Sequence, residues 1–306
     1  LALLFFAGWI TFPILALISL LQGLNNSFDM PARQTFVVEM VERKEDLGSA
    51  IALNSTLVNG ARMIGPSVGG LLIAAFGEGS CFLLDGLSYF FILGSLFAMR
   101  IEGRKKEGRK RKIWPELKEG FRYVLDSHVI RSALLMVALI SVMGMPYTVL
   151  MPIFATKVLH GGPHALGFLM AAIGVGALGG GLFLASFRSG EGLGKVIAAA
   201  AGVFGCGLIA FSLSRSLPLS LGLLLFAGFG MMVGTAGSNT LLQTVVQDDK
   251  RARVMSFYAL AFMGMSPIGS LLSGCLANFI GAPFTVRLGG IFCILASLFY
   301  AKASPR

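Results

Sequence analysis

The sequence predicts an all-α polytopic membrane protein, and three observations support that fold class. Hydrophobic residues make up 55% of the 306 positions, whereas only 13% are charged. The mean hydropathy of +0.79 is typical of a chain that lies in lipid. Apolar runs of the length that spans a bilayer, about 20 residues, recur between short polar turns.

We expect about nine full transmembrane helices and an N-terminal stub. Residues 1–8 read as the tail of a helix, with one long tilted helix over residues 1–29 as the alternative. A short cytoplasmic loop containing Pro31 and Arg33 should follow the first complete span. The expected spans are 11–29, 47–76, 81–99, 129–156, 164–187, 195–214, 217–246, 252–280 and 284–301.

The net charge of +10 is distributed unevenly. Nearly all Lys and Arg residues fall on one side of the expected spans. This positive-inside bias assigns that side, and the C-terminus, to the cytoplasmic face of a plasma or inner membrane. The same distribution disfavours nucleic acid as a partner.

Residues 100–128 form the one long polar segment. A basic run over residues 104–112 is followed by apolar residues at helical spacing, which predicts an amphipathic helix on the inner leaflet. Anionic lipids are the expected partners of this loop. A regulatory or partner-binding loop is the alternative. The apolar residues are Trp114, Leu117, Phe121 and Val124.

The expected span 47–76 carries a polar stripe within an apolar helix. Ser55, Asn59 and Arg62 recur at i, i+4 and i+7, so they share one face. An arginine inside the membrane costs about 2.5 kcal/mol or more, so this face should look onto protein or a water-filled cavity. The candidates for the pathway or for coupling on this helix are Asn54, Ser55, Asn59 and Arg62.

Small residues predict tight helix packing in three of the expected spans. Ala61, Gly65 and Gly69 repeat every four residues beside the polar stripe, which lets a neighbouring backbone approach closely. The expected spans 164–187 and 217–246 are dense in glycine, and we expect them to cross other helices closely.

Four further candidates, three for the pathway and one for a proton site, lie on other spans. Asn239 and Gln243 are four residues apart, which suits either a cavity face or hydrogen bonding between helices. Tyr147 lies beside methionines that would make an adaptable apolar wall or plain core packing. Asp85 reads as interfacial, with a proton site as the alternative.

The sequence does not indicate an enzyme. It contains no HExxH, no phosphate-binding glycine loop with lysine and no CxxC, and none of its three histidines lies in the interior of an expected span. We therefore expect no metal and no cofactor. Without an ATP site, an ion gradient would have to drive any transport.

A weak internal repeat divides the chain. The segment from Val41 resembles the segment from Val246, and the stretch ending at Gly77 resembles the one ending at Gly281, an offset of about 205 residues. This repeat predicts two similar bundles joined by the basic loop. The expected parts are 1–99, a partial N-terminal bundle, 100–128, the loop, and 129–306, a six-helix bundle.

These features resemble the major facilitator superfamily. Residues 28–41, 52–72 and 241–260 are similar to bacterial exporters of the enterobactin-exporter and macrolide-efflux type. The resemblance covers the whole chain and aligns its start with the end of the third helix. It implies a major facilitator fold of two pseudo-symmetric helical bundles, truncated at the N-terminus.

Two short motifs also resemble those of drug–proton antiporters. Gly65, Pro66, Gly69 and Gly70 match the GPxxGG core of the fifth-helix motif of drug–proton antiporters, although Ala61 stands where that motif usually has glycine. Gln22 and Gly23 match the end of the fourth-helix motif, whose arginine is replaced by Ser19.

The resemblance also implies a charge that gates the cytoplasmic side. Asp29 lies where related proteins have an acid that pairs with an arginine of the loop between helices two and three. Asp29 and Arg33 are therefore the expected gating charges.

The implied function is proton-coupled export of small amphipathic compounds, such as a drug, a macrolide or a siderophore. A monomer with two bundles rocking about a midplane site would work by alternating access. A symporter or lysophospholipid flippase on the same fold is one alternative. A membrane scaffold or sensor that transports nothing is another.

Overall fold

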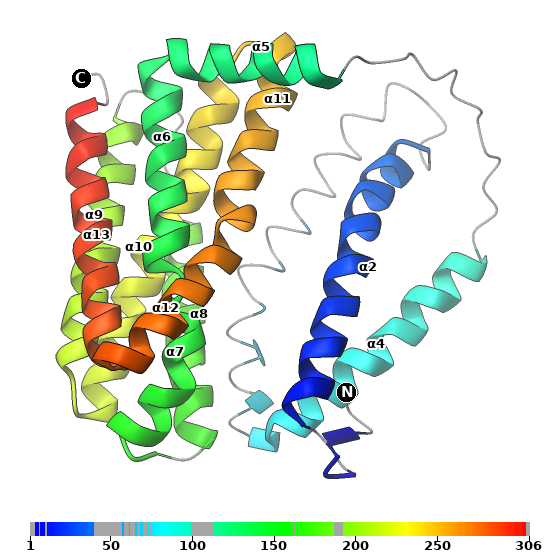
Figure 1. Cartoon of the computed structure of the whole chain (residues 1–306), viewed down its shortest axis with the longest axis vertical. Coiled ribbons are helices and arrows are strands. Elements are labelled where there is room, and N and C mark those ends of the chain that lie inside the picture. The colour runs from blue at the N-terminus through cyan, green and yellow to red at the C-terminus, as the bar shows by residue number, and fades with distance from the viewer. Residues whose placement is uncertain are drawn as a thin grey trace. The chain divides into compact units, whose positions relative to one another are not determined.

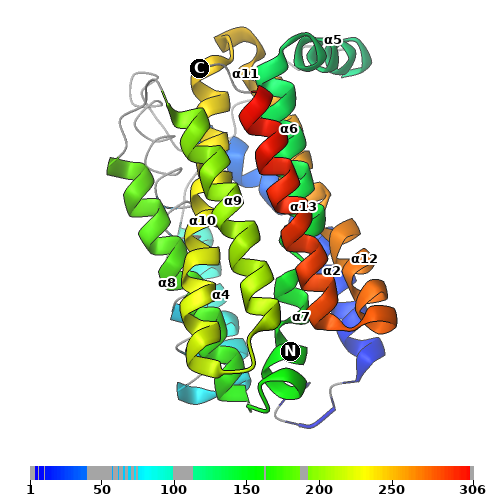
Figure 2. The same ribbon diagram turned by 90° about the vertical axis from the view of Figure 1, so that its left-hand side faces the viewer.

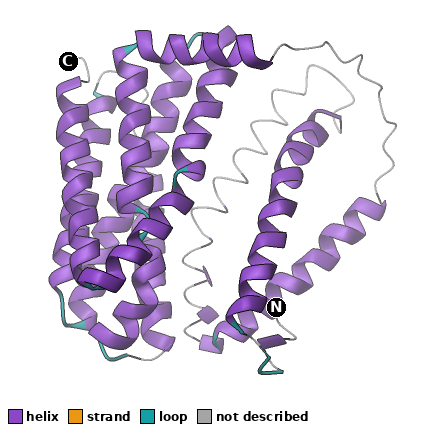
Figure 3. Ribbon diagram, viewed as in Figure 1, coloured by secondary structure: helices purple, strands orange, loops and turns teal. Residues whose placement is uncertain are grey.

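The computed structural model describes residues 4–5, 7–9, 11–39, 75–98, 113–161, 163–186 and 192–303, together with positions 57, 61, 65, 68–69 and 72–73. All regular secondary structure in these ranges is helical (Figure 3). The chain divides into two compact units. The first holds residues 1–62 and 75–109, and the second holds residues 63–74 and 110–306.

Seven of the described helices are long and apolar enough to cross a membrane. Six of them, from His128–Val158 to Ala282–Ala303, belong to the second unit, and Gly79–Ala98 belongs to the first. The described residues do not confirm the expected number of nine. The span 47–76 lies mostly outside the described residues, and the apolar helical stretch Phe12–Asn25 is shorter than the other spans.

In the first unit, a turn at Gly8 precedes the first span. Gly8 has a φ of +69°, and the amide of Trp9 donates to the carbonyl of Leu4 at 3.0 Å, so the chain reverses its direction there before the span begins. Residues 1–29 are therefore not one helix. The described helices of this unit are α2 (Phe12–Glu39) and α4 (Glu78–Ala98).

The loop expected after residue 29 was placed too early. α2 continues through Pro31 and Arg33 to Glu39. Polar residues end the apolar pattern near Asn25, but a helix can run on beyond the apolar part because its own hydrogen bonds satisfy its backbone. An internal proline removes only one of these bonds. Asp29 and Arg33 are thus helical positions.

The second unit begins with α5 (Ile113–Asp126) and continues as six spans. The bounds of all six candidate spans agree with the sequence prediction to within two residues. The fifth, Arg253–Ile280, begins inside a helix that starts at Asp248. Figures 1 and 2 show these helices side by side in one bundle. The spans are α6 (His128–Leu139) with α7 (Tyr147–Ile153), α8 (Pro163–Ser186), α9 (Leu193–Leu213), α10 (Leu217–Val245), α11 (Asp248–Ala259) with α12 (Ser266–Ile280), and α13 (Ala282–Ala303).

Two of the spans are interrupted by π-helical turns. Ile140–Gly144 separates α6 from α7 just before Pro146, and Leu260–Gly264 separates α11 from α12 just before Pro267. A further π-helical turn, Phe154–Val158, follows α7. Such turns are rare and occur often at functional positions.

Close backbone crossings hold this bundle together, as the glycine density predicted. A Cβ on Gly228 of α10 would lie 2.9 Å from the carbonyl carbon of Ile173 on α8, and a Cβ on Gly176 would lie 2.8 Å from that of Leu225. Gly205 of α9 and Gly290 of α13 face each other in the same way, each 2.6 Å from the other's carbonyl oxygen by this measure. In lipid, this close packing supplies much of the attraction between helices.

Candidate functional site

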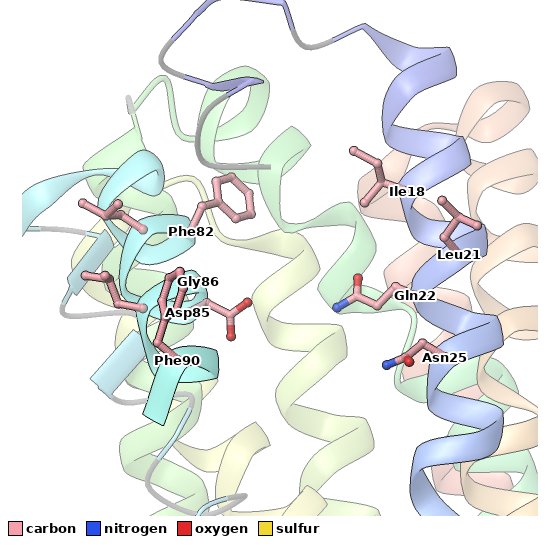
Figure 4. A pocket seen from close by; sticks show the side chains of 10 residues that line it. Ile18, Leu21, Gln22, Asn25, Phe82, Asp85, Gly86 and Phe90 are labelled. Carbon is pink, nitrogen blue, oxygen red and sulfur yellow. The ribbon is translucent and has the colours of Figure 1, made fainter. Parts of the chain in front are cut away.

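A half-open groove of about 560 Å³ lies between α2 and α4 in the first unit (Figure 4). Its volume is in the range of small-molecule sites. One wall is formed by α2 and the other by α4, in the part of each helix that is apolar enough to lie in a membrane. The lining residues are Ile18, Leu21, Gln22, Asn25, Phe82, Leu83, Asp85, Gly86, Leu87 and Phe90.

Three polar side chains face this groove. Figure 4 shows the carboxylate of Asp85 and the amide of Gln22 directed toward each other, with Asn25 one helical turn further along α2. Among the described residues, no lysine, arginine or histidine forms an ion pair with Asp85. Its backbone carbonyl oxygen accepts a hydrogen bond from the hydroxyl of Ser88 at 2.7 Å.

Only part of this groove was predicted from the sequence. Asp85 was weighed as an interfacial residue, and Gln22 was noted only as the end of a motif. Asn25 and the two phenylalanines were missed. The usable signal was that Asp85 is the one charged residue in the run 79–98, and that Gln22 and Asn25 share a face of an apolar helix at i, i+3. Their meeting across two helices could not be read from either helix alone.

In the second unit, the structure joins two of the predicted candidates. The amide nitrogen of Gln243 donates to the side-chain oxygen of Asn239, both on α10. Gln243 is exposed and Asn239 is half-buried. This pair therefore lies on an accessible side of the bundle.

Tyr147 occupies a different environment. Its side chain is only 2% exposed, its ring meets that of Phe204 edge-on at 5.9 Å, and its hydroxyl lies 3.9 Å from the sulfur of Met231. This places Tyr147 in the packed interior of the second unit.

Most residues of the predicted polar stripe and packing motif lie outside the residues that the structure describes. Ala61, Gly65 and Gly69 are helical, and no described atom lies within 4 Å of a Cβ placed on Gly65 or Gly69. Asp29 is half-buried on α2, whereas the side chain of Arg33 is not described. These site assignments remain predictions. The candidates outside the described residues are Asn54, Ser55, Asn59, Arg62, Pro66 and Gly70.

The predicted amphipathic helix, α5, is docked on α11. Glu119 pairs with Lys250 and with Arg253, the latter at 2.7 Å. The rings of Phe121 and Phe257 lie 6.2 Å apart, and a Cβ on the buried Gly120 would lie 3.2 Å from the Cβ of Arg253. The helix after the basic run is therefore fixed to the bundle through one side.

We expect Glu119→Gln to loosen α5. The hydrogen bonds from Lys250, and then from Arg253, hold the pKa of Glu119 below its ordinary value of 4.5. A lowered pKa means that the ion pairs add stability above that ordinary value and lose it as the pH falls through the lowered pKa. Hydrogen exchange of residues 113–126 should be faster in the variant than in the unaltered protein at pH 7, and the difference should vanish in acid.

The matched control for this prediction is Asp126→Asn. Asp126 ends the same helix and forms no ion pair with any described residue, so its replacement should leave exchange unchanged. Equal exchange in the Glu119→Gln variant and the unaltered protein at pH 7 would show that the ion pairs do not fix α5.

Comparison with known proteins identifies the family. The transmembrane secretion effector family, of the major facilitator type, matches residues 1–304. The chain is 23% identical over 287 residues to the staphyloferrin A transporter of Staphylococcus aureus, which covers 94% of this chain and 71% of that protein. It is 26% identical over 274 residues to the multidrug efflux pump Tap of Mycolicibacterium fortuitum, with 87% and 66% covered.

A third relative is also named as a transporter. The multidrug efflux pump Tap of Mycobacterium tuberculosis is 25% identical over 275 residues, with 88% of this chain and 65% of the pump covered. The chain thus spans about two thirds of the length of such relatives. They are transporters and not enzymes, and several helices of this chain can span a membrane. This multi-pass membrane protein therefore belongs to the transmembrane secretion effector family of major facilitator transporters.

Proposed function

We propose that this protein is a secondary active exporter of small amphipathic compounds, driven by protons and working by alternating access. The observation that carries the proposal is the groove between α2 and α4, which brings polar groups and apolar walls together between two apolar helical stretches. Relatives that are named as multidrug efflux pumps support the outward direction.

The groove offers what an amphipathic compound needs. Its apolar walls can bury a hydrocarbon part, while Asp85, Gln22 and Asn25 can bind a polar part. A polar group that faces hydrocarbon without a partner is costly, so this arrangement favours an occupant with polar atoms of its own.

For coupling, we propose that Arg62 works with the polar stripe of Asn54, Ser55 and Asn59. The support is energetic, because an arginine in a spanning helix is expensive unless it faces water or a partner. The Asn239–Gln243 pair on α10 is a further candidate for the pathway, since it lies on an accessible side of the second unit. Asp29 and Arg33 stay our candidates for gating at the cytoplasmic end of α2.

The repeat supports the packing role of Gly65. Aligning Gly77 with Gly281 places Gly65 opposite Gly269. A Cβ on Gly269 would lie 2.7 Å from the Cα of Val142, so this position is a close backbone crossing in the second unit. We propose that Gly65 serves the same purpose within a first bundle of like design, with the basic loop joining the two bundles.

An efflux measurement tests the proposed function. Cells producing the full-length protein, loaded with a fluorescent amphipathic dye, should export it, and an uncoupler should stop the export. Arg62→Ala should slow export by about tenfold or more, since a charge inside the membrane is replaced, whereas Arg62→Lys should retain more of it. Export that persists under the uncoupler would contradict proton coupling. Equal dye retention with and without the protein would contradict export itself.

A further inference from the structure

We infer that the π-helical turns Ile140–Gly144 and Leu260–Gly264 form one joint, in which both turns change together between a π-helical and an α-helical form. The hydroxyl of Ser141 biases this change, because it gains a hydrogen bond only in the α-helical form. The joint lies wholly within the second unit. Neither the joint nor its test depends on which compound the protein transports.

The two turns share one sequence pattern. The first reads ISVMGMP from Ile140 and the second reads LAFMGMSP from Leu260, so each contains Met-Gly-Met ahead of a proline. Their hydrogen bonds match as well. The amide of Met145 donates to the carbonyl of Ile140 at 2.8 Å, and the amide of Met265 donates to that of Leu260 at 3.1 Å. Equivalent residues, five positions apart, therefore close the π-helical bond in each turn.

The proline after each turn brings the two forms closer in energy. In an α-helix, each carbonyl accepts from the amide four residues later. Proline has no amide, so Pro146 leaves the carbonyl of Val142 without that donor, and Pro267 does the same to the carbonyl of Met263. An α-helical form of either turn therefore lacks one hydrogen bond, which removes part of its advantage over the π-helical form.

The side chain of Ser141 is not satisfied in the π-helical form. It is 0% exposed, and its hydroxyl has no hydrogen-bond partner among the described residues. Two equally buried serines, Ser212 and Ser238, donate to carbonyls three and four residues back, each at 2.6 Å. A buried hydroxyl without a partner is costly, so the first turn bears a cost that these two helices do not.

An α-helical first turn would give this hydroxyl a partner. A serine in an α-helix donates to the carbonyl three or four residues back, which here belongs to Ala138 or Val137. Ala261 holds the equivalent position in the second turn and has no hydroxyl. The bias toward the α-helical form therefore enters the joint through Ser141.

The two turns are linked through α12 and also contact each other directly. A Cβ on Gly269 of α12 would lie 2.7 Å from the Cα of Val142 in the first turn. The amide of Gly269 donates to the carbonyl of Met265, directly after the second turn, at 3.0 Å. A change in the first turn would therefore press on backbone that is hydrogen-bonded to the end of the second. Because close packing leaves no room for an independent shift, both turns should change together.

NMR relaxation dispersion of the methionine methyl groups tests the joint on the purified full-length protein in lipid nanodiscs. Met145 and Met265 report on the first and the second turn, and we expect both methyl groups to show one common exchange rate. Ser141→Ala removes the unpaired hydroxyl of the π-helical form and the hydrogen bond of the α-helical form. Both effects favour the π-helical form, so the population of the other form should fall by about fivefold or more at both methyl groups.

Two further variants isolate the role of the hydroxyl. Ser238→Ala is the matched control, because it removes an equally buried hydroxyl that is already hydrogen-bonded, and it should leave exchange at both turns unchanged. Adding Ala261→Ser to Ser141→Ala places a hydroxyl at the equivalent position of the second turn. This double variant should return the population at both methyl groups toward that of the unaltered protein.

Several results would overturn the joint. Different exchange rates at Met145 and Met265, or a response to Ser141→Ala at Met145 alone, would show that the turns move independently. Absence of exchange at both methyl groups, or equal effects of Ser141→Ala and Ser238→Ala, would show that the Ser141 hydroxyl does not bias a change of form. Failure of Ala261→Ser to restore the population would show that the two turns are not equivalent.

Discussion

Gly228→Ala is expected to destabilise the second unit by about 2 kcal/mol or more, because the added methyl group has no room. It would lie 2.9 Å from the carbonyl carbon of Ile173 and still closer to its oxygen. The obstacle is backbone and not the end of a flexible side chain, so α8 and α10 would have to separate. Close contact between these helices would then be lost along the crossing.

A lower stability of the Gly228→Ala variant would show that the added methyl group clashes with its neighbours. Alanine stabilises a helix by about 1 kcal/mol relative to glycine, so a change without a clash should be neutral or favourable. Gly222→Ala, on the same helix, is the matched control, because no described atom lies within 4 Å of its added Cβ. Thermal unfolding followed by size-exclusion chromatography in mild detergent should give a lower midpoint for Gly228→Ala only. Equal midpoints for the two variants would contradict the close crossing.

Gly269→Ala should destabilise the second unit about as much as Gly228→Ala does, and it should slow transport more than Gly228→Ala does. Its added Cβ would lie 2.7 Å from the Cα of Val142, which belongs to the π-helical turn Ile140–Gly144. On the other side, a Cβ on Gly289 of α13 would lie 3.3 Å from the carbonyl carbon of Met143 in the same turn. The turn is thus enclosed between two glycines, and a methyl group on either one would displace it.

Efflux and unfolding should be measured on the same variant. We expect Gly269→Ala to reduce dye export by about tenfold even below its unfolding midpoint, because a shift of a few tenths of an ångström or more in a packed interface is costly. Gly274→Ala, on the same helix and with no described atom within 4 Å, should export normally. Normal export by Gly269→Ala would show that this crossing is not needed for transport.

Much of the fold could be predicted from the sequence because apolar length alone marks a span. The six spans of the second unit and the amphipathic helix α5 followed from the apolar and charged patterns, and the close crossings followed from glycine density. The extension of α2 through Pro31 was missed because the membrane pattern ends before the helix does. The π-helical turns were missed because one inserted residue barely alters a periodic pattern in an almost wholly apolar span.

The candidate site was harder to predict than the fold. Asp85, Gln22 and Asn25 become a site only when two helices lie side by side, and a single sequence does not specify which faces meet. Tyr147 illustrates the opposite case, because a side chain singled out for a pathway lies in the packed interior. The docking of α5 depended on Glu119 meeting two basic residues that lie 131 and 134 positions later in the chain.

A π-helical turn accommodates one extra residue, and one extra residue rotates every side chain beyond it by about 100° relative to an unbroken α-helix. If the position of the extra residue shifted along Ile140–Gly144 or Leu260–Gly264, one half of the span would rotate about its axis while the other half kept its neighbours. Peptide hydrogen bonds would be exchanged one at a time during the rotation, so no peptide group would face lipid unpaired for long. In each of these two spans, one half could therefore rotate about the helix axis independently of the other half.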